Sequence, residues 1–442
     1  MPEAVYRFPK NFLWGSATAA HQVEGNNTNN NWYYWENQPG KIVNGDKAGL
    51  ACDWWEGRWK GDLEQAAKDG QNAHRFSVEW SRIQPTENSW DVDALANYRE
   101  MAEGMARMGI RPVVTLHHFT DPLWIFEEGG WENDRTVGYF ADYVRQVVST
   151  LKDYVDLWVT INEPVVYTAS GYLEGSFPPG KNNLGAAFRV MRNLIKGHAA
   201  AYRIIHEMQP QAMVGVAKHF RAMQPARWWF LPDIWITRFT SGSFNDAFSN
   251  TLVKGKFRFA LRSERIPEAV GTQDFVGVNY YSLDKVVVKP FDIKSLFHRR
   301  FYPKEAEISE TGFIANLPEG MFLALDWARR FKLPIYITEN GVEDSLDELR
   351  PNYLARHLHQ VWRAANFNWN IKGYFYWTQV DNFEWERGWT QRFGLWHLNV
   401  ETQERIRHKS AELYAKVCKE NALSSETVRK YAPDAFDLLF PT

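Results

Sequence analysis

Cysteine is scarce in this chain of 442 residues, which contains only Cys52 and Cys418. So few thiols in so long a chain exclude a disulfide scaffold and fit a reducing compartment. The first residues also lack the basic segment, the apolar stretch and the small-residue cleavage site of a secretory leader. Together these absences predict a cytoplasmic protein.

An excess of positive charge is absent too. Lys and Arg number 51 against 53 Asp and Glu, which gives a net charge of −2. Nucleic acids and anionic membranes attract proteins through a positive field, so the balance predicts neither of them as a partner. The sequence also has no uninterrupted apolar run close to the roughly 20 residues of a membrane-spanning helix.

Linkers and phosphate-binding motifs are missing as well. No Ser/Gly-rich tract or short repeat divides the sequence, so we predict one domain over residues 1–442. Neither GxGxxG nor GxxxxGK followed by Ser or Thr occurs, which argues against a phosphate site. Aromatic residues are abundant instead, with 21 Trp, 19 Tyr and 28 Phe. This composition favours a flat, amphipathic ligand.

Short β-branched or aromatic runs alternate with longer segments whose apolar residues recur at helical spacing. The predicted strands are Phe12–Ala19, Ala73–Val78, Arg111–Leu116, Leu157–Ile161, Met213–Ala217, Phe275–Asn279, Ile335–Thr338 and Gly373–Trp377. The main predicted helices are Val92–Met108, Arg135–Tyr154, Leu184–Met208, Pro318–Phe331 and Leu349–Ala365. Such helices allow right-handed crossovers between parallel strands, so the pattern predicts an α/β fold, a single-domain (β/α)8 TIM barrel.

In such a barrel the active site forms at the carboxyl ends of the strands. Carboxylates, amides, His and Trp crowd the predicted ends, which are His21–Asn26, Arg75–Arg82, His117–Pro122, Ile161–Pro164, Asn279–Tyr281, Thr338–Gly341 and Trp377–Trp385. Amides and carboxylates bind hydroxyls, and an aromatic face packs against the C–H face of a sugar ring. The mixture therefore suits a neutral polyhydroxylated ligand.

The adjacent histidines His117 and His118 raise the question of a metal site. Neighbouring strand residues point to opposite faces, so this pair supplies only one inward ligand. We expect no metal and no other cofactor. His74, next to Arg75, is expected to be a packed histidine rather than a catalytic one.

Two glutamates end predicted strands that face each other across the barrel mouth. Glu163 follows the fourth strand and Glu339 the seventh. Two carboxylates can cleave a glycosidic bond, since one protonates the leaving oxygen while the other attacks the anomeric carbon or activates water. Each can equally be a buried structural acid held by an arginine, and the spacing alone leaves both interpretations open.

Six motifs stand out along the chain: FPKNFLWGSATAAHQVEG, RFSVEWSRI, TINEP, ITENG, DNFEW and RFGL. At these motifs the chain resembles glycoside hydrolase family 1, the β-glucosidase family, and the resemblance extends nearly from end to end. The resemblance implies a retaining exo-β-glycosidase with Glu163 as acid/base and Glu339 as covalent nucleophile. The implied sugar-binding residues are Gln22, His118, Asn162, Tyr281, Trp377, Glu384 and Trp385. The implied support of the nucleophile is Arg75, Asn279 and Tyr281.

Each implied role has a physical basis. The positive charge of Arg75 and a hydrogen bond from Tyr281 both favour the ionised form of Glu339, so we expect both to lower the pKa of Glu339 and keep it ready to attack. Glu163 must instead carry a proton in the free enzyme. We expect the two carboxyl groups to lie about 5 to 5.5 Å apart. The resemblance also implies a cis peptide bond between Trp377 and Thr378.

Glu384 bears on the substrate, because a carboxylate there accepts hydrogen bonds from the 4- and 6-hydroxyls of a sugar but repels a 6-phosphate. The 6-phospho-β-glycosidase branch has Ser at this position, so the resemblance favours an unphosphorylated β-glycoside. The chain departs from the usual family pattern at His21, Phe119 and Thr378–Gln379, where Tyr, Trp and Ser–Leu are common. The choice among glucose, galactose and fucose therefore stays open.

Two further segments each allow two interpretations. Arg227–Phe239, RWWFLPDIWITRF, either lines an aglycone site or forms a helix that docks its aromatics on the barrel. Lys289–Lys304 is basic and forms either a solvated loop or an anion site. The alternatives to a β-glucosidase are a transglycosylase that uses the same intermediate and a catalytically silent sugar-binding barrel. The sequence indicates no oligomeric state.

Overall fold

A closed barrel of parallel strands forms the centre of the structure, a computed structural model that describes residues 4–260, 262–292 and 297–441. The barrel strands are β2 (Leu13–Ala17), β3 (Ala73–Ser77), β4 (Arg111–His117), β5 (Leu157–Asn162), β6 (Met213–His219), β10 (Phe275–Asn279), β13 (Ile335–Asn340) and β14 (Ile371–Tyr376). Their order around the barrel follows the sequence, and β14 pairs with β2 to close it. All the predicted strands lie in this barrel, so the predicted (β/α)8 TIM barrel is confirmed.

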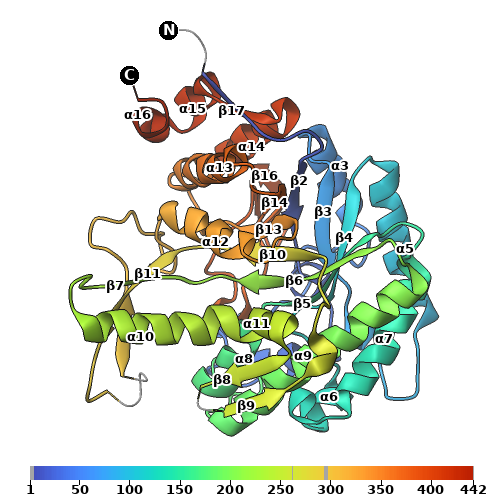
Figure 1. The fold of residues 1–442 in the computed structure, drawn as a ribbon. Coiled ribbons are helices and arrows are strands. Elements are labelled where there is room, and N and C mark those ends of the chain that lie inside the picture. The colour runs from blue at the N-terminus through green and yellow to red at the C-terminus, as the bar shows by residue number, and fades with distance from the viewer. Residues whose placement is uncertain (1–3, 261, 293–296, 442) are drawn as a thin grey trace.

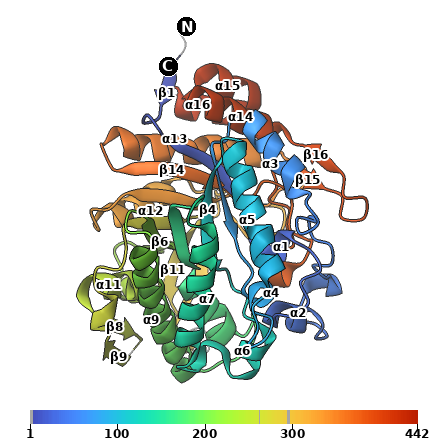
Figure 2. The same ribbon diagram turned by 90° about the vertical axis from the view of Figure 1, so that its right-hand side faces the viewer.

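A helix follows each barrel strand and covers the outside of the barrel (Figure 1). These helices are α3 (Trp59–Lys68), α5 (Val92–Arg107), α7 (Thr136–Leu151), α9 (Leu184–Met208), α11 (Ala247–Lys254), α12 (Glu319–Arg329), α13 (Arg350–Asn366) and α14 (Lys409–Glu420). Figure 2 shows α5, α7 and α9 side by side on one flank of the molecule. The bounds of the predicted helices agree with these to within one turn.

The sequence starts these helices with capping residues and gives them one apolar face. Asp91 accepts backbone hydrogen bonds from Asp93 and Ala94 at the start of α5, and Asn183 caps α9 through the backbone N–H of Ala186. Along α7 the buried residues recur at intervals of three and four, which turns one stripe of the helix toward the barrel. The strands β3 and β5 are buried along their whole length, as expected of parallel strands covered by helices.

The two ends of the chain meet on one side of the barrel. Strand β1 (Val5–Arg7) pairs antiparallel with β17 (Ala422–Ser424), and the helices α15 (Ser425–Tyr431) and α16 (Phe436–Leu439) follow. The ring of Tyr6 stacks on Phe440 with centroids 4.7 Å apart. Figure 1 shows both termini at the same edge of the molecule.

Smaller elements surround the barrel, and sequence periodicity did not identify them. A three-stranded sheet consists of β7 (Ala222–Pro225), β11 (Leu283–Val288) and β12 (His298–Phe301), and β8 (Lys256–Phe259) pairs with β9 (Arg262–Arg265). Strand β15 (Trp396–Leu398) pairs with β16 (Arg405–Arg407). The shorter helices are α1 (Ala20–Val23), α2 (Asn31–Glu36), α4 (Trp80–Ile83), α6 (Leu123–Glu127), α8 (Pro164–Ala169) and α10 (Leu231–Ser241). Among the described residues, no helix has both the length and the apolarity needed to cross a bilayer.

The aromatic segment Arg227–Phe239 contains the start of α10, and its tryptophan side chains face solvent. Trp228, Trp229 and Trp235 are 80%, 64% and 63% exposed. None of these three lines the cavity described below. Both interpretations of this segment were therefore wrong, because its aromatics neither dock on the barrel nor contact the cavity.

The basic segment Lys289–Lys304 lies partly outside the described residues, which omit 293–296. Lys289, Arg299 and Lys304 are exposed, in keeping with a solvated segment. Arg300 on β12 differs, because its side chain reaches the rim of the cavity.

Candidate active site

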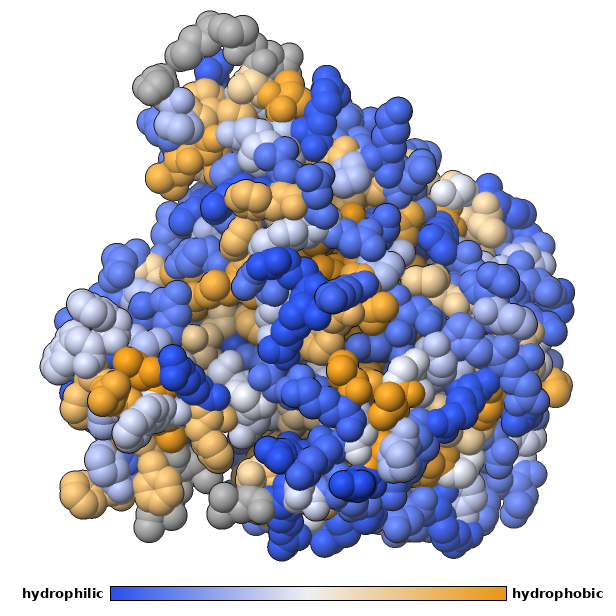
Figure 3. Space-filling view, viewed as in Figure 1, coloured by the Kyte–Doolittle hydropathy of each residue, from blue (hydrophilic) through white to orange (hydrophobic). Residues whose placement is uncertain are grey.

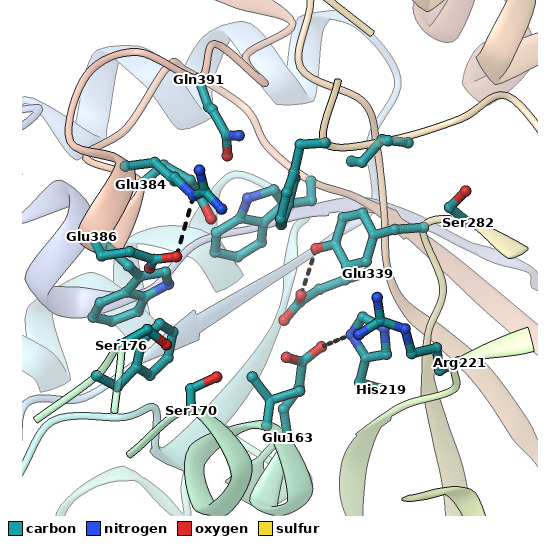
Figure 4. A pocket seen from close by; sticks show the side chains of 18 of the residues that line it. Glu163, Ser170, Ser176, His219, Arg221, Ser282, Glu339, Glu384, Glu386 and Gln391 are labelled. Atoms are coloured by element: carbon teal, nitrogen blue, oxygen red, sulfur yellow. Dashed lines mark hydrogen bonds and ion pairs between the residues drawn. The ribbon is translucent and has the colours of Figure 1, made fainter. Parts of the chain in front are cut away.

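A cavity of about 390 Å³ opens at the carboxyl end of the barrel. Glu163, just after β5, and Glu339, near the end of β13, both line it. Figure 4 shows their carboxyl groups directed toward each other from opposite walls, with Glu384 on a third side. The volume falls within the range of small-molecule sites, so the cavity can enclose a single sugar ring.

The carboxylate of Glu339 is held on both oxygens. Arg75 Nη1 donates to Oε1 over 2.6 Å, and the Tyr281 hydroxyl donates to Oε2 over 2.7 Å. Arg75 is fully buried, and its Nε donates to Thr115 Oγ1 over 2.9 Å. These bonds fix the position of the Glu339 carboxyl group in the cavity wall.

The pKa of Glu339 nevertheless lies above its ordinary value. Burial, the largest effect, raises the pKa of Glu339 to about 7, and the nearby Glu163 carboxylate adds to the rise. The positive charge of Arg75 and the hydrogen bond from Tyr281 act in the expected direction, but they only offset part of it.

Glu163 is held by two side chains from neighbouring strands. Asn279 Nδ2 at the end of β10 donates to Glu163 Oε1 over 2.8 Å, and His219 Nδ1 at the end of β6 lies 3.2 Å from the same oxygen. The His219 ring also stacks on Tyr281 with centroids 5.8 Å apart. The backbone of Glu163 has φ 43°, in the left-handed region that side chains with a Cβ rarely adopt. Such a conformation is typical of functional sites.

His219 is a site residue that sequence reasoning missed. The predicted fifth strand ended at Ala217, whereas β6 continues to His219. The rule that strand ends carry the site would have identified it had that boundary been correct.

Asn162 lies between the two halves of the site. Its Oδ1 accepts a hydrogen bond from Arg75 Nη2 over 2.7 Å, so its Nδ2 faces His118 Nε2, 2.9 Å away. His118 Nε2 is then the acceptor and Nδ1 carries the hydrogen. Burial and the charge of Arg75 hold the pKa of His118 well below its usual range, which keeps the ring neutral. Nδ1 is buried and has no partner among the described residues.

The opposite wall carries Glu384. Gln22 Nε2 donates to Glu384 Oε2 over 3.2 Å and to the backbone oxygen of Phe383 over 2.8 Å. Burial, followed by the charge of Glu386, raises the pKa of Glu384 well above its ordinary value. Gln22 Oε1 is a second buried polar atom without a partner in the described part of the chain. Trp377 and Trp385 line the cavity beside these groups.

The residues that depart from the common pattern lie around Trp385 and Trp377, and Phe119 among them lines the cavity. The His21 ring lies parallel to Trp385 with centroids 6.1 Å apart, and Phe119 meets the same indole edge-on at 5.2 Å. Thr378 Oγ1 donates to the backbone oxygen of Ala17 over 2.6 Å. The peptide bond between Trp377 and Thr378 is cis, as predicted.

The remaining histidines of the strand ends are structural. His117 Nε2 lies 3.0 Å from Asp121 Oδ1 and turns away from the cavity that His118 lines. His74 is buried between the hydroxyls of Ser16 and Thr18, and burial lowers its pKa to about 3. Within the described ranges, no three His, Cys, Asp or Glu side chains are grouped to hold a metal ion.

The entrance of the cavity carries charged residues that the sequence did not single out. Arg221 Nε donates to Asp284 Oδ2 over 2.6 Å, and Arg300 Nη1 lies 3.9 Å from the same oxygen. Glu174 and Glu386 also line the cavity. The arginines come from the β7–β11–β12 sheet and its approach, elements that periodicity did not predict.

The chain resembles known proteins over nearly its whole length. The sequence model of glycosyl hydrolase family 1 matches residues 5–423. Beta-glucosidase A of Thermotoga maritima is 34% identical, with 95% of this chain and 99% of the relative covered. A beta-galactosidase of Pyrococcus woesei is 29% identical, with 95% of this chain and 98% of the relative covered.

Solved structures give the same result. A beta-glycosidase from Pyrococcus horikoshii superposes with a TM-score of 0.90 at 35% identity, covering 97% of this chain and 98% of the other. A beta-glucosidase from Thermotoga maritima in complex with glucoimidazole gives a TM-score of 0.90 at 32% identity, with 95% of this chain and all of the other covered. With its barrel, its pair of facing glutamates and this full-length match, the chain belongs to glycosyl hydrolase family 1 and is a glycoside hydrolase that acts on O-glycosyl bonds.

Proposed function

We propose that this enzyme is a retaining exo-β-glycosidase for unphosphorylated β-glucosides, in which Glu163 is the acid/base and Glu339 the nucleophile. The observation that carries the proposal is a cavity with two unlike halves. One half holds the facing carboxyl groups of Glu163 and Glu339, and the other holds Glu384 and His118, whose buried Nδ1 has no partner among the described residues. Hydroxyl groups of a sugar satisfy such atoms, because each hydroxyl both donates and accepts.

In the first step a carboxylate oxygen of Glu339 attacks the anomeric carbon. The glycosidic C–O bond breaks with its electron pair on the leaving oxygen, and the proton of Glu163 moves to that oxygen. The products are the free aglycone and a glycosyl ester of Glu339. Arg75 and Tyr281 hold the attacking carboxylate in place, so the step starts from an aligned nucleophile.

In the second step the now ionised Glu163 takes a proton from water. The water oxygen attacks the anomeric carbon, the ester bond to Glu339 breaks, and the carboxylate is regenerated. Two inversions restore the β configuration. Asn162 lies between Arg75 and His118, and its Nδ2 group can bind the 2-hydroxyl, a contact that strengthens in the oxocarbenium-like transition state.

Glu384 supports the choice of glycone. Its carboxyl group, held by Gln22, accepts from the 4- and 6-hydroxyls and leaves no favourable position for a phosphate. The relatives are named as beta-glucosidases and as a beta-galactosidase, which supports glucose as the main glycone with galactose as a side substrate.

A panel of aryl β-glycosides that differ at the 4- and 6-positions tests this assignment. We expect the glucoside to react fastest and the 6-phosphoglucoside to be inert. Proton NMR should detect β-glucose as the first product. An α-anomer as first product contradicts the retaining mechanism, and no release of aryl alcohol from any member would instead support the silent sugar-binding barrel. Product analysis at high acceptor concentration separates hydrolysis from transglycosylation.

Two broader assignments accompany this function. We propose that residues 1–442 act as one catalytic domain, since the two ends of the chain pair with each other through β1 and β17. We also propose a cytoplasmic location. Cys52 and Cys418 are free, buried thiols, which supports a reducing compartment.

A further inference from the structure

The helix α10 turns its apolar side chains toward solvent. Leu231, Trp235 and Phe239 follow at intervals of four, so they share one face, and all three are exposed. The polar residues Asp233 and Thr237, also four apart, are buried. This is the reverse of an ordinary surface helix, which buries its apolar face.

The reversal is fixed by hydrogen bonds. Asp233 accepts two bonds from Arg227, over 2.7 and 2.9 Å, and a third from the backbone N–H of Val288 on β11 over 2.9 Å. Thr237 Oγ1 donates to the backbone oxygen of Asp233 over 2.6 Å. The inward polar groups are therefore satisfied, and α10 is tied to the sheet with its aromatics outward.

Further aromatic side chains extend this face. Strands β7 and β11 run parallel with Val286 opposite Pro225, and the backbone N–H of Ala226 donates to Val286 over 2.8 Å. The chain after Pro225 therefore lies beside the chain after Val286. Phe291 follows Val286 by five residues and is 97% exposed, and Trp228 and Trp229, which follow Pro225, are exposed as well. We refer to six exposed apolar residues together as the aromatic patch: Trp228, Trp229, Leu231, Trp235, Phe239 and Phe291.

Figure 3 shows apolar side chains at the left of the molecule, over α10 and the neighbouring end of the β7–β11 sheet, with hydrophilic side chains among them. Among the described residues of the segment 285–304, Lys289 and Arg299 are exposed, whereas Arg300 lies at the cavity entrance near Asp284. Arg238 is exposed between Trp235 and Phe239. Three exposed basic side chains, Arg238, Lys289 and Arg299, thus accompany the exposed aromatics on α10 and the β7–β11–β12 sheet.

We propose that the aromatic patch docks this enzyme on the surface of an anionic lipid bilayer. Trp and Phe side chains partition into the interfacial region, and Lys and Arg beside them are attracted to anionic headgroups. The expectation of no membrane partner rested on the net charge of the whole chain, which does not reveal a local group of exposed basic side chains. A second copy of the chain fits less well, because a two-fold contact brings the basic segments face to face.

The test is co-sedimentation of the full-length enzyme with vesicles of phosphatidylcholine alone or mixed with phosphatidylglycerol. We expect binding to the phosphatidylglycerol vesicles, and we expect added salt to weaken it. The variant W228S/W229S/W235S should bind at least about tenfold more weakly. A matched control, L346S/F367S/L438S, removes three exposed apolar side chains elsewhere and should bind as the wild type does.

Hydrolysis of an aryl β-glucoside in solution is the folding control, and we expect the same rate for the wild type and both variants. Because this assay needs no vesicles, it also separates a failure of membrane binding from a failure of the proposed function. The proposal is wrong if the wild type does not sediment with anionic vesicles, or if the tryptophan variant sediments equally well. Sedimentation velocity tests for self-association through the same patch. If the wild type forms a dimer and does not bind vesicles, and if the tryptophan variant is a monomer, the aromatic patch instead binds a second copy of the chain.

Discussion

Tyr281 donates to the oxygen of Glu339 that Arg75 does not hold, so it has a direct effect on the charge of that carboxyl group. The bond favours the ionised form and offsets part of the rise in the pKa of Glu339 that burial causes. In the proposed mechanism only the ionised form attacks. The acid limb of the pH profile of kcat/KM should therefore report this carboxyl group, with a midpoint near the pKa of about 7.

Tyr281→Phe removes the hydrogen bond and keeps the ring. The pKa of Glu339 should rise, so the acid limb should move to higher pH, and kcat should fall about 10- to 100-fold. The measurement is kcat and KM against pH with an aryl β-glucoside. Tyr280→Phe is the control, because the Tyr280 hydroxyl donates to the Leu317 backbone oxygen over 2.6 Å and does not contact Glu339. An unmoved limb in Tyr281→Phe contradicts the assignment.

The sequence-based predictions reached most of the site, because the carboxyl ends of barrel strands converge whatever their side chains are. Glu163, Glu339 and Asn162 follow from this rule. His219 does not, since one strand was predicted two residues too short. Arg300 does not either, because β12 is a short exposed strand whose alternation is obscured by a run of basic residues. The pKa of Glu339 needed the structure, since burial decides it.

At the scale of elements, the loop after β14 carries Glu384 and Trp385 into the cavity. Asp381 holds this loop together. Its carboxylate accepts from the backbone N–H groups of Gly394 and Leu398, over 2.8 and 3.2 Å, and lies 3.0 Å from His397 Nδ1. Burial raises the pKa of Asp381, but the hydrogen bond from His397 and the charges of nearby arginines outweigh it, so the pKa lies below its ordinary value.

Asp381→Asn should destabilise the protein by about 1 to 3 kcal/mol near neutral pH, because an amide replaces a buried, fully bonded carboxylate. A depressed pKa stabilises the folded state above the unfolded pKa of about 3.9, and this contribution is lost as pH falls through the folded pKa. The difference from wild type should thus be constant down to about pH 5 and shrink below about pH 4. Urea unfolding at several pH values measures it. A difference that grows toward acid pH contradicts the assignment.

The barrel strands were predictable because each is a short apolar run between turns, and a helix of clear periodicity follows most of them. The orientation of helix α10 was not predictable, since its aromatic side chains face solvent whereas Asp233 and Thr237 are buried. Periodicity finds a face but does not say whether that face is buried. The polar partners that hold α10, Arg227 and the backbone of Val288, are visible only in three dimensions.

At the scale of the whole molecule, the chain closes on itself. Tyr6 on β1 contacts the rings of Trp362 and Phe440, with centroids 4.2 and 4.7 Å away. Its hydroxyl donates to the backbone oxygen of Leu439. The first strand is thus joined to the last helix and to α13.

Tyr6→Ala should lower the free energy of unfolding by about 2 to 4 kcal/mol, because these ring contacts are lost together. kcat and KM at low temperature should not change, since the site lies at the carboxyl end of the barrel. Differential scanning calorimetry and an aryl β-glucoside assay measure the two effects. Tyr6→Phe, which keeps the ring, should recover most of the stability. An unchanged unfolding temperature in Tyr6→Ala would show that the termini do not contribute to closure.

The assignment of Glu163 as acid/base and Glu339 as nucleophile is tested most directly by azide rescue of Glu163→Ala. With an activated aryl β-glucoside, this variant should still form the glycosyl ester of Glu339, because a good leaving group needs no acid, but water should react with the ester slowly. Azide, which needs no base, should attack the ester from the side that Glu163 has vacated. We predict that NMR identifies the product as β-glucosyl azide. An α-glucosyl azide would contradict the account and exchange the roles of the two glutamates.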